Sequence, residues 1–144
     1  MTPDQIALVQ DSFTKVVPIA AHAADLFYDR LFAIAPRFRP MFPDDMREQK
    51  KKLVAMLATV VPNLHRLDSM MSAVQDLGRR HAGYGVSGEH YAPVGEALLW
   101  TLQQGLGSDF TPAVKAAWSE AYLTLSRAMT DAAAEQMNPN LRTL

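Results

Sequence analysis

Apolar residues recur every three or four positions through almost the whole chain, and this period restricts the fold more than any other feature. Side chains at that spacing share one face of an α-helix, whereas strands need strict alternation. No alternating run of useful length and no strand–helix–strand unit is visible. We therefore expect an all-α fold of six or seven unequal helices in one domain over residues 1–144, with loose termini at 1–3 and about 137–144.

Prolines and glycines divide this pattern into segments. Thr-Pro at 2–3 and again at 111–112 places a capping residue before proline, which is typical of a helix start. Pro18 interrupts the first helical pattern, and Pro36 and Pro40 confine the next segment to a short turn. Further helices are expected over about 46–61 and 70–81, from 91 to a stop at 107, and from 112 to about 136. On the first of these the expected buried face is marked by Leu53, Leu57, Val60 and Leu64, and residues 63–69 are expected to be a plain connection.

Composition excludes several kinds of chemistry. The chain has no cysteine, so disulfides, thiolate nucleophiles, thiolate-bound zinc and iron–sulfur clusters are ruled out. A net charge of −1 argues against a nucleic-acid partner. The longest apolar run, at 53–61, is much shorter than the roughly twenty residues of a membrane span. With no signal-peptide pattern at the N-terminus, we expect a soluble, cytoplasmic protein with no membrane span.

One histidine lies where it could bind a cofactor. His81 follows Val74 and Leu77 on an apolar helical stripe, within LGRRHAGYGV at 77–86. A histidine on such a stripe is more often a core residue bonded to a carbonyl than a ligand. The histidines at 22, 65 and 90 form no i, i+3 or i, i+4 pair, so no zinc site is indicated. A single imidazole can still hold a haem, because the porphyrin supplies four of the iron ligands itself.

A haem pocket also needs a polar group opposite the histidine and an aromatic wall. Gln49 and Leu53 share a helix face upstream of His81, and Phe42 lies in a proline-flanked turn. Taken alone, Gln49 is also typical of an exposed helix residue, and Tyr28 of a core tyrosine with its hydroxyl at the surface. Trp118 is more typical of core packing than of a cofactor contact. These residues alone leave both interpretations of His81 open.

Four stretches in order resemble the globin family, specifically bacterial single-domain haemoglobins and the haem domains of flavohaemoglobins. They are LFYDRLFAIAPRFRPMF (26–42), REQKKKL (47–53), LGRRHAGYGVSGEHYAPVGEALL (77–99) and AAWSEAY (116–122). The resemblance covers about residues 4–135. It implies a globin fold, a three-over-three helical sandwich around a haem pocket, with haem b (iron protoporphyrin IX) as the cofactor.

The resemblance also implies roles for individual residues. His81 would be the proximal iron ligand, with its other ring nitrogen bonded to a backbone carbonyl. Tyr28 and Gln49 would donate hydrogen bonds to dioxygen on the distal side, where Phe42 would pack on the haem face. Lys52 would reach a propionate. The full set of expected cofactor-binding residues is His81, Phe42, Tyr28, Gln49, Lys52, Leu53, Leu77, Val86, Tyr91, Val94 and Leu98.

The chain departs from the flavohaemoglobin pattern in two respects. It has no glycine-rich dinucleotide loop, so any electrons would come from a separate reductase. Of the tyrosine and glutamate that orient the proximal histidine in that family, Tyr91 matches the first. The glutamate position falls on Ala133, with Asp131 and Glu135 out of register. Without a proximal carboxylate the histidine is less basic, which argues against efficient peroxidase-like or dioxygenase-like chemistry.

Three functions are compatible with these features. The first is reversible binding of dioxygen for storage, delivery or scavenging, with carbon monoxide and nitric oxide as further ligands and no catalytic residue. The second is nitric oxide dioxygenation with a partner reductase. The third, ranked last, is a haem-free sensing or interaction module, which would be expected to lack the histidine or the apolar slot. The sequence leaves open a monomer or a homodimer.

Overall fold

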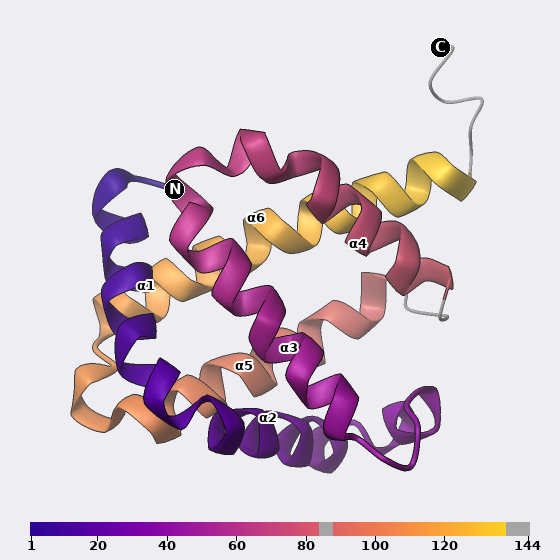
Figure 1. The fold of residues 1–144 in the computed structure, drawn as a ribbon, viewed down its shortest axis with the longest axis horizontal. Helices are drawn as coiled ribbons and strands as arrows, with labels where there is room; N and C mark the ends of the chain where they lie inside the picture. The colour runs from indigo at the N-terminus through magenta and orange to yellow at the C-terminus, as the bar shows by residue number, and fades with distance from the viewer. Residues whose placement is uncertain (84–87, 138–144) are drawn as a thin grey trace.

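The computed structural model describes residues 1–83 and 88–137, and its regular structure there is entirely helical (Figure 1). None of the helices in these two ranges is long and apolar enough to cross a membrane. The α-helices are α1 (Pro3–Val16), α2 (Ala20–Ile34), α3 (Arg47–Val60), α4 (Met71–Gly83), α5 (Tyr91–Leu106) and α6 (Pro112–Met137). Short 3-10 segments join them: η1 (Val17–Ile19), η2 (Pro36–Met41), η3 (Val61–Met70), η4 (Gly88–His90) and η5 (Gly107–Asp109). The all-α expectation is confirmed.

Helix boundaries follow the capping residues. The Thr2 hydroxyl accepts a hydrogen bond from the Gln5 N–H, and the Thr2 N–H donates to the Gln5 side chain, both at 3.1 Å. Thr2 and Pro3 therefore form the capped start of α1 that the sequence predicts. The Thr111 hydroxyl caps α6. Gly107 follows α5 with φ +57°, a left-handed conformation that ends the helix at little cost only for glycine.

The prolines shape the connections. Pro18 lies in η1 between α1 and α2, and η2 begins at Pro36 and contains Pro40. The segment expected to be a plain connection after α3 is instead the 3-10 segment η3, which bends at Arg66, where φ is −137° and ψ is 47°. Leu57, expected on the buried face of the preceding helix, is half-buried at the edge of the core.

A first core cluster joins α1 to α6, with contributions from α3, η3 and α5. At its centre the Trp118 indole N–H donates to the Ser12 hydroxyl at 2.8 Å, and that hydroxyl donates to the Leu8 carbonyl at 2.7 Å. Because the Trp118 N–H and the Ser12 hydroxyl both have partners, Trp118 adds apolar area without an unsatisfied donor. The cluster consists of Val9, Phe13, Val16, Val60, Val61, Leu64, Leu102, Leu106, Val114, Ala117, Trp118 and Ala121.

A second core cluster lies between α2, η2 and α5. It consists of Phe27, Tyr28, Leu31, Ala35, Phe38 and Ala97. Partly buried apolar side chains from other elements cover it, among them Phe42 and Leu53. Leu98 packs against both clusters. Five of the eleven residues expected to bind the cofactor lie in or against this second cluster: Tyr28, Phe42, Leu53, Val94 and Leu98.

Helices α4 and α6 cross at close range (Figure 1). A Cβ atom added to Gly78 would lie only 2.4 Å from the carbonyl oxygen of Met129 on α6. Real Cβ atoms do not approach backbone so closely, so the crossing requires glycine at this position. The contact fixes the helix that carries His81.

We expect Gly78→Ala to lower the free energy of unfolding by about 2 kcal/mol, because the two backbones must separate. A matched control is Gly105→Ala on α5, whose added Cβ would meet only the end of the Ile19 side chain at 3.2 Å. The control should change stability by less than about 1 kcal/mol, since alanine also favours the helix. Urea unfolding of both variants measures the difference. Equal stabilities would contradict the close crossing.

Candidate functional site

The expected distal pair is brought together across two helices. The Gln49 amide nitrogen on α3 donates to the Tyr28 hydroxyl oxygen on α2 at 3.2 Å, although the residues are 21 positions apart. Tyr28 is only 4% exposed, and Gln49 is half-buried. Beside them the Lys50 ammonium pairs with the Asp25 carboxylate at 2.8 Å and ties the same two helices together. The interpretations of Tyr28 as a core tyrosine with a surface hydroxyl and of Gln49 as fully exposed do not describe this arrangement.

Burial raises the pKa of Tyr28, and the hydrogen bond from Gln49 opposes that shift. The phenol therefore stays neutral at physiological pH and keeps its proton. Because Gln49 donates to the hydroxyl oxygen, the hydroxyl hydrogen remains available to a further acceptor. This polar pair can offer a hydrogen bond to a small ligand.

Aromatic rings surround the phenol of Tyr28. The Phe42 ring meets it edge to face at a centroid distance of 5.7 Å and meets Phe32 at 5.4 Å. Phe27 lies 4.9 Å from Tyr28 on another side. Phe42 is half-buried, as is Leu53, so both retain apolar surface that a bound group could cover. The structure thus places the predicted Phe42 and Leu53 beside the predicted Tyr28.

The imidazole of His81 is oriented from within its own helix. Its Nδ1 lies 2.7 Å from the Leu77 carbonyl oxygen, one turn earlier on α4, and both residues are half-buried. If Nδ1 carries the proton and donates to this carbonyl, Nε2 has a free lone pair that can bind a metal. The carbonyl partner that the resemblance implied is therefore present, and it is Leu77.

The start of α5 is held by α6. The Tyr122 hydroxyl donates to the Tyr91 carbonyl, and its ring lies where a Cβ on Gly95 would be 2.8 Å away. Burial is the main cause that raises the pKa of Tyr122 well above its usual value. Apolar periodicity does not single out Tyr122, although this residue lies within the stretch AAWSEAY. This contact places the half-buried Tyr91, and Val94 and Leu98 follow it on the same helix.

The structure does not place every expected residue at the site. Lys52 is exposed on α3, and Val86 falls outside the described residues. On α6, Ala133 is half-buried and Asp131 is exposed. His22 and His65 are exposed, whereas the His90 ring packs on Phe38 at a centroid distance of 4.7 Å. Apolar periodicity also does not identify Phe32, Gly78 and Arg39, because none of them belongs to an apolar helical stripe.

The residues present fit a haem. In residues 1–83 and 88–137, no three histidine, aspartate or glutamate side chains gather as a metal site. One imidazole with its Nδ1 engaged can supply a single axial ligand. Half-buried apolar side chains at Phe42, Leu53, Val94 and Leu98 offer surface to a flat ring. Such an arrangement is typical of proteins that hold a haem through one histidine.

Comparison with known families shows which family the chain belongs to. The globin family model matches residues 25–129, and the chain belongs to the globin family. A flavohemoprotein of Bacillus subtilis (strain 168) is 31% identical over 99 residues, which are 67% of this chain and 25% of that protein. A flavohemoprotein of Vibrio cholerae is 25% identical over 134 residues, 91% of this chain and 34% of that protein. The chain thus matches only a quarter to a third of these relatives' lengths.

Solved structures support the fold assignment. A bacterial globin from Campylobacter jejuni superposes with a TM-score of 0.80 at 27% identity, covering 95% of this chain and 99% of that one. A candidate nitric oxide dioxygenase from Rhodothermus marinus, engineered as a carbene transferase, gives 0.86 at 24% identity, covering 95% and 96%. At that identity the second match shows the fold alone. The predicted globin fold is confirmed.

The desolvated phenols predict a loss of stability at alkaline pH. Burial raises the pKa of Tyr28, Tyr91 and Tyr122 above the usual 10.0. Above pH 10 the unfolded chain releases these protons first, so the free energy of unfolding falls as the pH rises. Tyr28→Phe should make this fall shallower by up to about 1.4 kcal/mol per pH unit. Urea unfolding at pH 8, 10 and 11 tests this, and parallel pH profiles would contradict a desolvated Tyr28.

Proposed function

We propose that this globin binds haem b through His81 and binds dioxygen reversibly, for storage, delivery or scavenging. The observation that carries the proposal is the hydrogen bond between Gln49 and the buried Tyr28, 3.2 Å long and made between two helices. Family membership and the flavohemoprotein relatives support a haem site. Carbon monoxide and nitric oxide are further ligands of the same pocket.

On the proximal side the chain supplies a pre-oriented imidazole. When bound, a haem would supply an iron atom that can bind one diatomic ligand besides the imidazole of His81. With its Nδ1 proton donated to the Leu77 carbonyl, His81 would have its Nε2 lone pair free to hold the iron. Leu77, Tyr91, Val94 and Leu98 cover this side and exclude water. The expected place of Val86 in that wall stays a prediction.

On the distal side the chain supplies a hydrogen-bond donor and an apolar wall. The bond from Gln49 polarises the Tyr28 hydroxyl, which strengthens its own donation to a ligand. Phe42 and Leu53 keep bulk water from competing for that donor. Lys52 is exposed, so its ammonium is free to pair with a carboxylate at the pocket rim. These roles make the pocket suited to a small polarisable ligand such as dioxygen.

His81→Ala tests the cofactor. The purified protein should show an intense Soret band that shifts on reduction and again on exposure to dioxygen. The variant should lose or grossly alter this band, and added imidazole should restore it by filling the vacated position. His65→Ala, at an exposed position, is the matched control and should leave the spectrum unchanged. No Soret band in the wild type after haem is added would overturn the proposal in favour of the haem-free module.

Gln49→Leu and Tyr28→Phe test the distal pair. Each should speed dioxygen dissociation about tenfold, because each weakens or removes the charge-assisted hydrogen bond to the ligand. The double variant should show less than the product of the two effects, since both changes break the same bond. Lys51→Leu, exposed on the same helix, is the control and should not change the rate. Stopped-flow displacement by carbon monoxide measures the rates, and wild-type rates in both variants would contradict a distal hydrogen bond.

The second candidate function is nitric oxide dioxygenation with a separate reductase. It is favoured by the flavohemoprotein relatives. The alanine at 133 weighs against it, because no carboxylate at that position would make the histidine more basic. Steady consumption of nitric oxide with an added flavin reductase distinguishes the two functions. A single turnover without sustained consumption favours the binding protein.

A further inference from the structure

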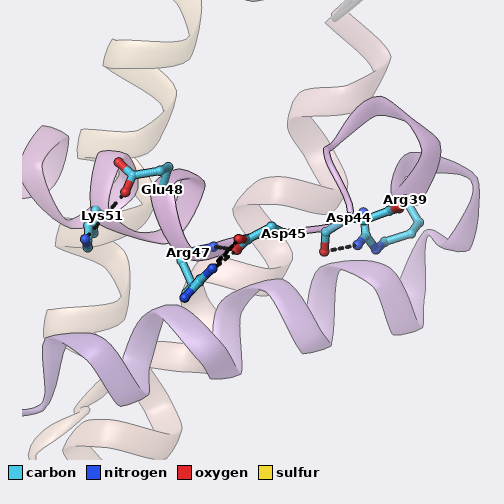
Figure 2. Close-up of polar contacts among 6 residues, drawn as sticks. All are labelled: Arg39, Asp44, Asp45, Arg47, Glu48 and Lys51. Atoms are coloured by element: carbon cyan, nitrogen blue, oxygen red, sulfur yellow. Dashed lines mark hydrogen bonds and ion pairs between the residues drawn. The ribbon is translucent and has the colours of Figure 1, made fainter.

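Arg39 binds three successive carbonyl groups of the loop between η2 and α3. Its Nη1 donates to the carbonyls of Phe42 at 3.3 Å and Pro43 at 2.9 Å. Its Nη2 donates to the carbonyl of Asp44 at 3.1 Å, the contact drawn in Figure 2. In return, the Phe42 N–H donates to the Arg39 carbonyl at 3.1 Å. The backbone of Phe42 is therefore held at both its N–H and its carbonyl.

The same guanidinium reaches the aromatic wall of the site. Its Cζ lies 5.2 Å from the centroid of the Phe32 ring. Phe32 meets Phe42 at 5.4 Å, and Phe42 meets Tyr28 at 5.7 Å. A continuous set of contacts thus runs from Arg39 to the hydroxyl that Gln49 holds. Arg39 therefore contacts both the backbone of Phe42 and the ring of Phe32, which packs against the Phe42 side chain.

Only arginine suits these contacts. A guanidinium offers five N–H donors in a planar fork, whereas a lysine ammonium is a compact point charge. The ion pairs within residues 1–83 and 88–137 do not include Arg39. Its charge is balanced by carbonyl dipoles and a ring face, which salt screens much less than an exposed ion pair.

Neighbouring ion pairs are weaker candidates for fixing the loop. Arg47 pairs with Asp45 at 2.7 Å, with side chains 84% and 59% exposed, and Lys51 pairs with Glu48 at 3.5 Å (Figure 2). The hydrogen bonds from Arg47 lower the pKa of Asp45. Pairs as exposed as these contribute little and are screened by salt. The bonds made by the half-buried Arg39 are therefore the stronger constraint on residues 42–44.

We propose that Arg39 is a positioning residue of the distal pocket, which fixes the Phe42 ring against Phe32 and Tyr28 by binding the carbonyls of residues 42–44. Its effect on ligands rests on the proposed function. The position of the Phe42 ring is a property of the chain itself and is measurable without haem. Without Arg39 the three carbonyls turn to water, Phe42 leaves Tyr28, and the distal donor becomes exposed to solvent.

Two variants and one control test this role. Arg39→Met keeps the apolar stem and removes every donor, whereas Arg39→Lys keeps the charge and removes the fork. Arg37→Met is the matched control, because Arg37 lies in the same 3-10 segment and stacks on Phe38 at 4.8 Å. Its contacts do not involve the carbonyls of residues 42–44. If Arg39→Met does not fold, the comparison of Arg39→Lys with the control carries the test.

The first measurement does not need haem. Amide hydrogen exchange at Phe42, whose N–H donates to the Arg39 carbonyl, should become about tenfold faster in both Arg39 variants. Nuclear Overhauser effects between the Phe42 and Tyr28 rings should weaken. The control should match the wild type, and added salt should not change the wild-type rates. Wild-type exchange in both Arg39 variants, full rescue by lysine or an equal effect in the control would overturn the proposal.

The second measurement uses the haem-loaded protein. Arg39→Met should release dioxygen several-fold faster and broaden the stretching band of carbon monoxide, at an unfolding temperature equal to that of the control. Faster loop exchange with wild-type release and an unchanged band would show that Arg39 orders the loop alone, which overturns its role in the pocket. If the wild type takes up no haem, the exchange rates and ring contacts still decide the role of Arg39. That failure then belongs to the proposed function.

Discussion

The position of His81 depends on the close crossing of α4 and α6 at Gly78. Helices satisfy their own backbone hydrogen bonds, so side chains and close backbone approaches decide how they are arranged. Helix α6 makes several such contacts. Trp118 donates a hydrogen bond to α1, Tyr122 donates one to α5, and the backbone of Met129 lies against Gly78 of α4. His81 lies one turn beyond Gly78. A wider crossing would move the imidazole away from the rest of the site.

The period of apolar residues and the capping residues predicted the helices well, because both are local properties of the chain. The Thr2 cap, the proline interruptions and the stop at Gly107 are of this kind. The pairing of Tyr28 with Gln49 came from the family resemblance, since nothing periodic links residues on different helices. Leu57 was expected to be buried and is half-buried, because apolar spacing does not show where a core ends.

Other features had no signal in the pattern. A glycine within a helix usually indicates a locally less stable helix. The need for glycine at position 78 becomes visible only when the backbone of Met129 is placed opposite it. Arg39 lies on no apolar stripe, and a side chain that binds carbonyls three to five residues ahead leaves no period. The two sides of the site also differ in whether their geometry is local to one helix. His81 is oriented within one helix, whereas the distal pair requires α2 and α3 to be packed.

The core is divided into two clusters, and Leu98 packs against both. The first cluster holds Trp118 and the contacts between α1 and α6, while the second provides the wall around Tyr28. Substitutions in the second cluster can therefore alter which ligand is held, while the first continues to stabilise the chain. In evolutionary terms, residues of the pocket can change, and with them the ligand that is preferred, under only weak constraint from the stability of the fold. For the same reason, this small domain is a good scaffold for redesigning a ligand site.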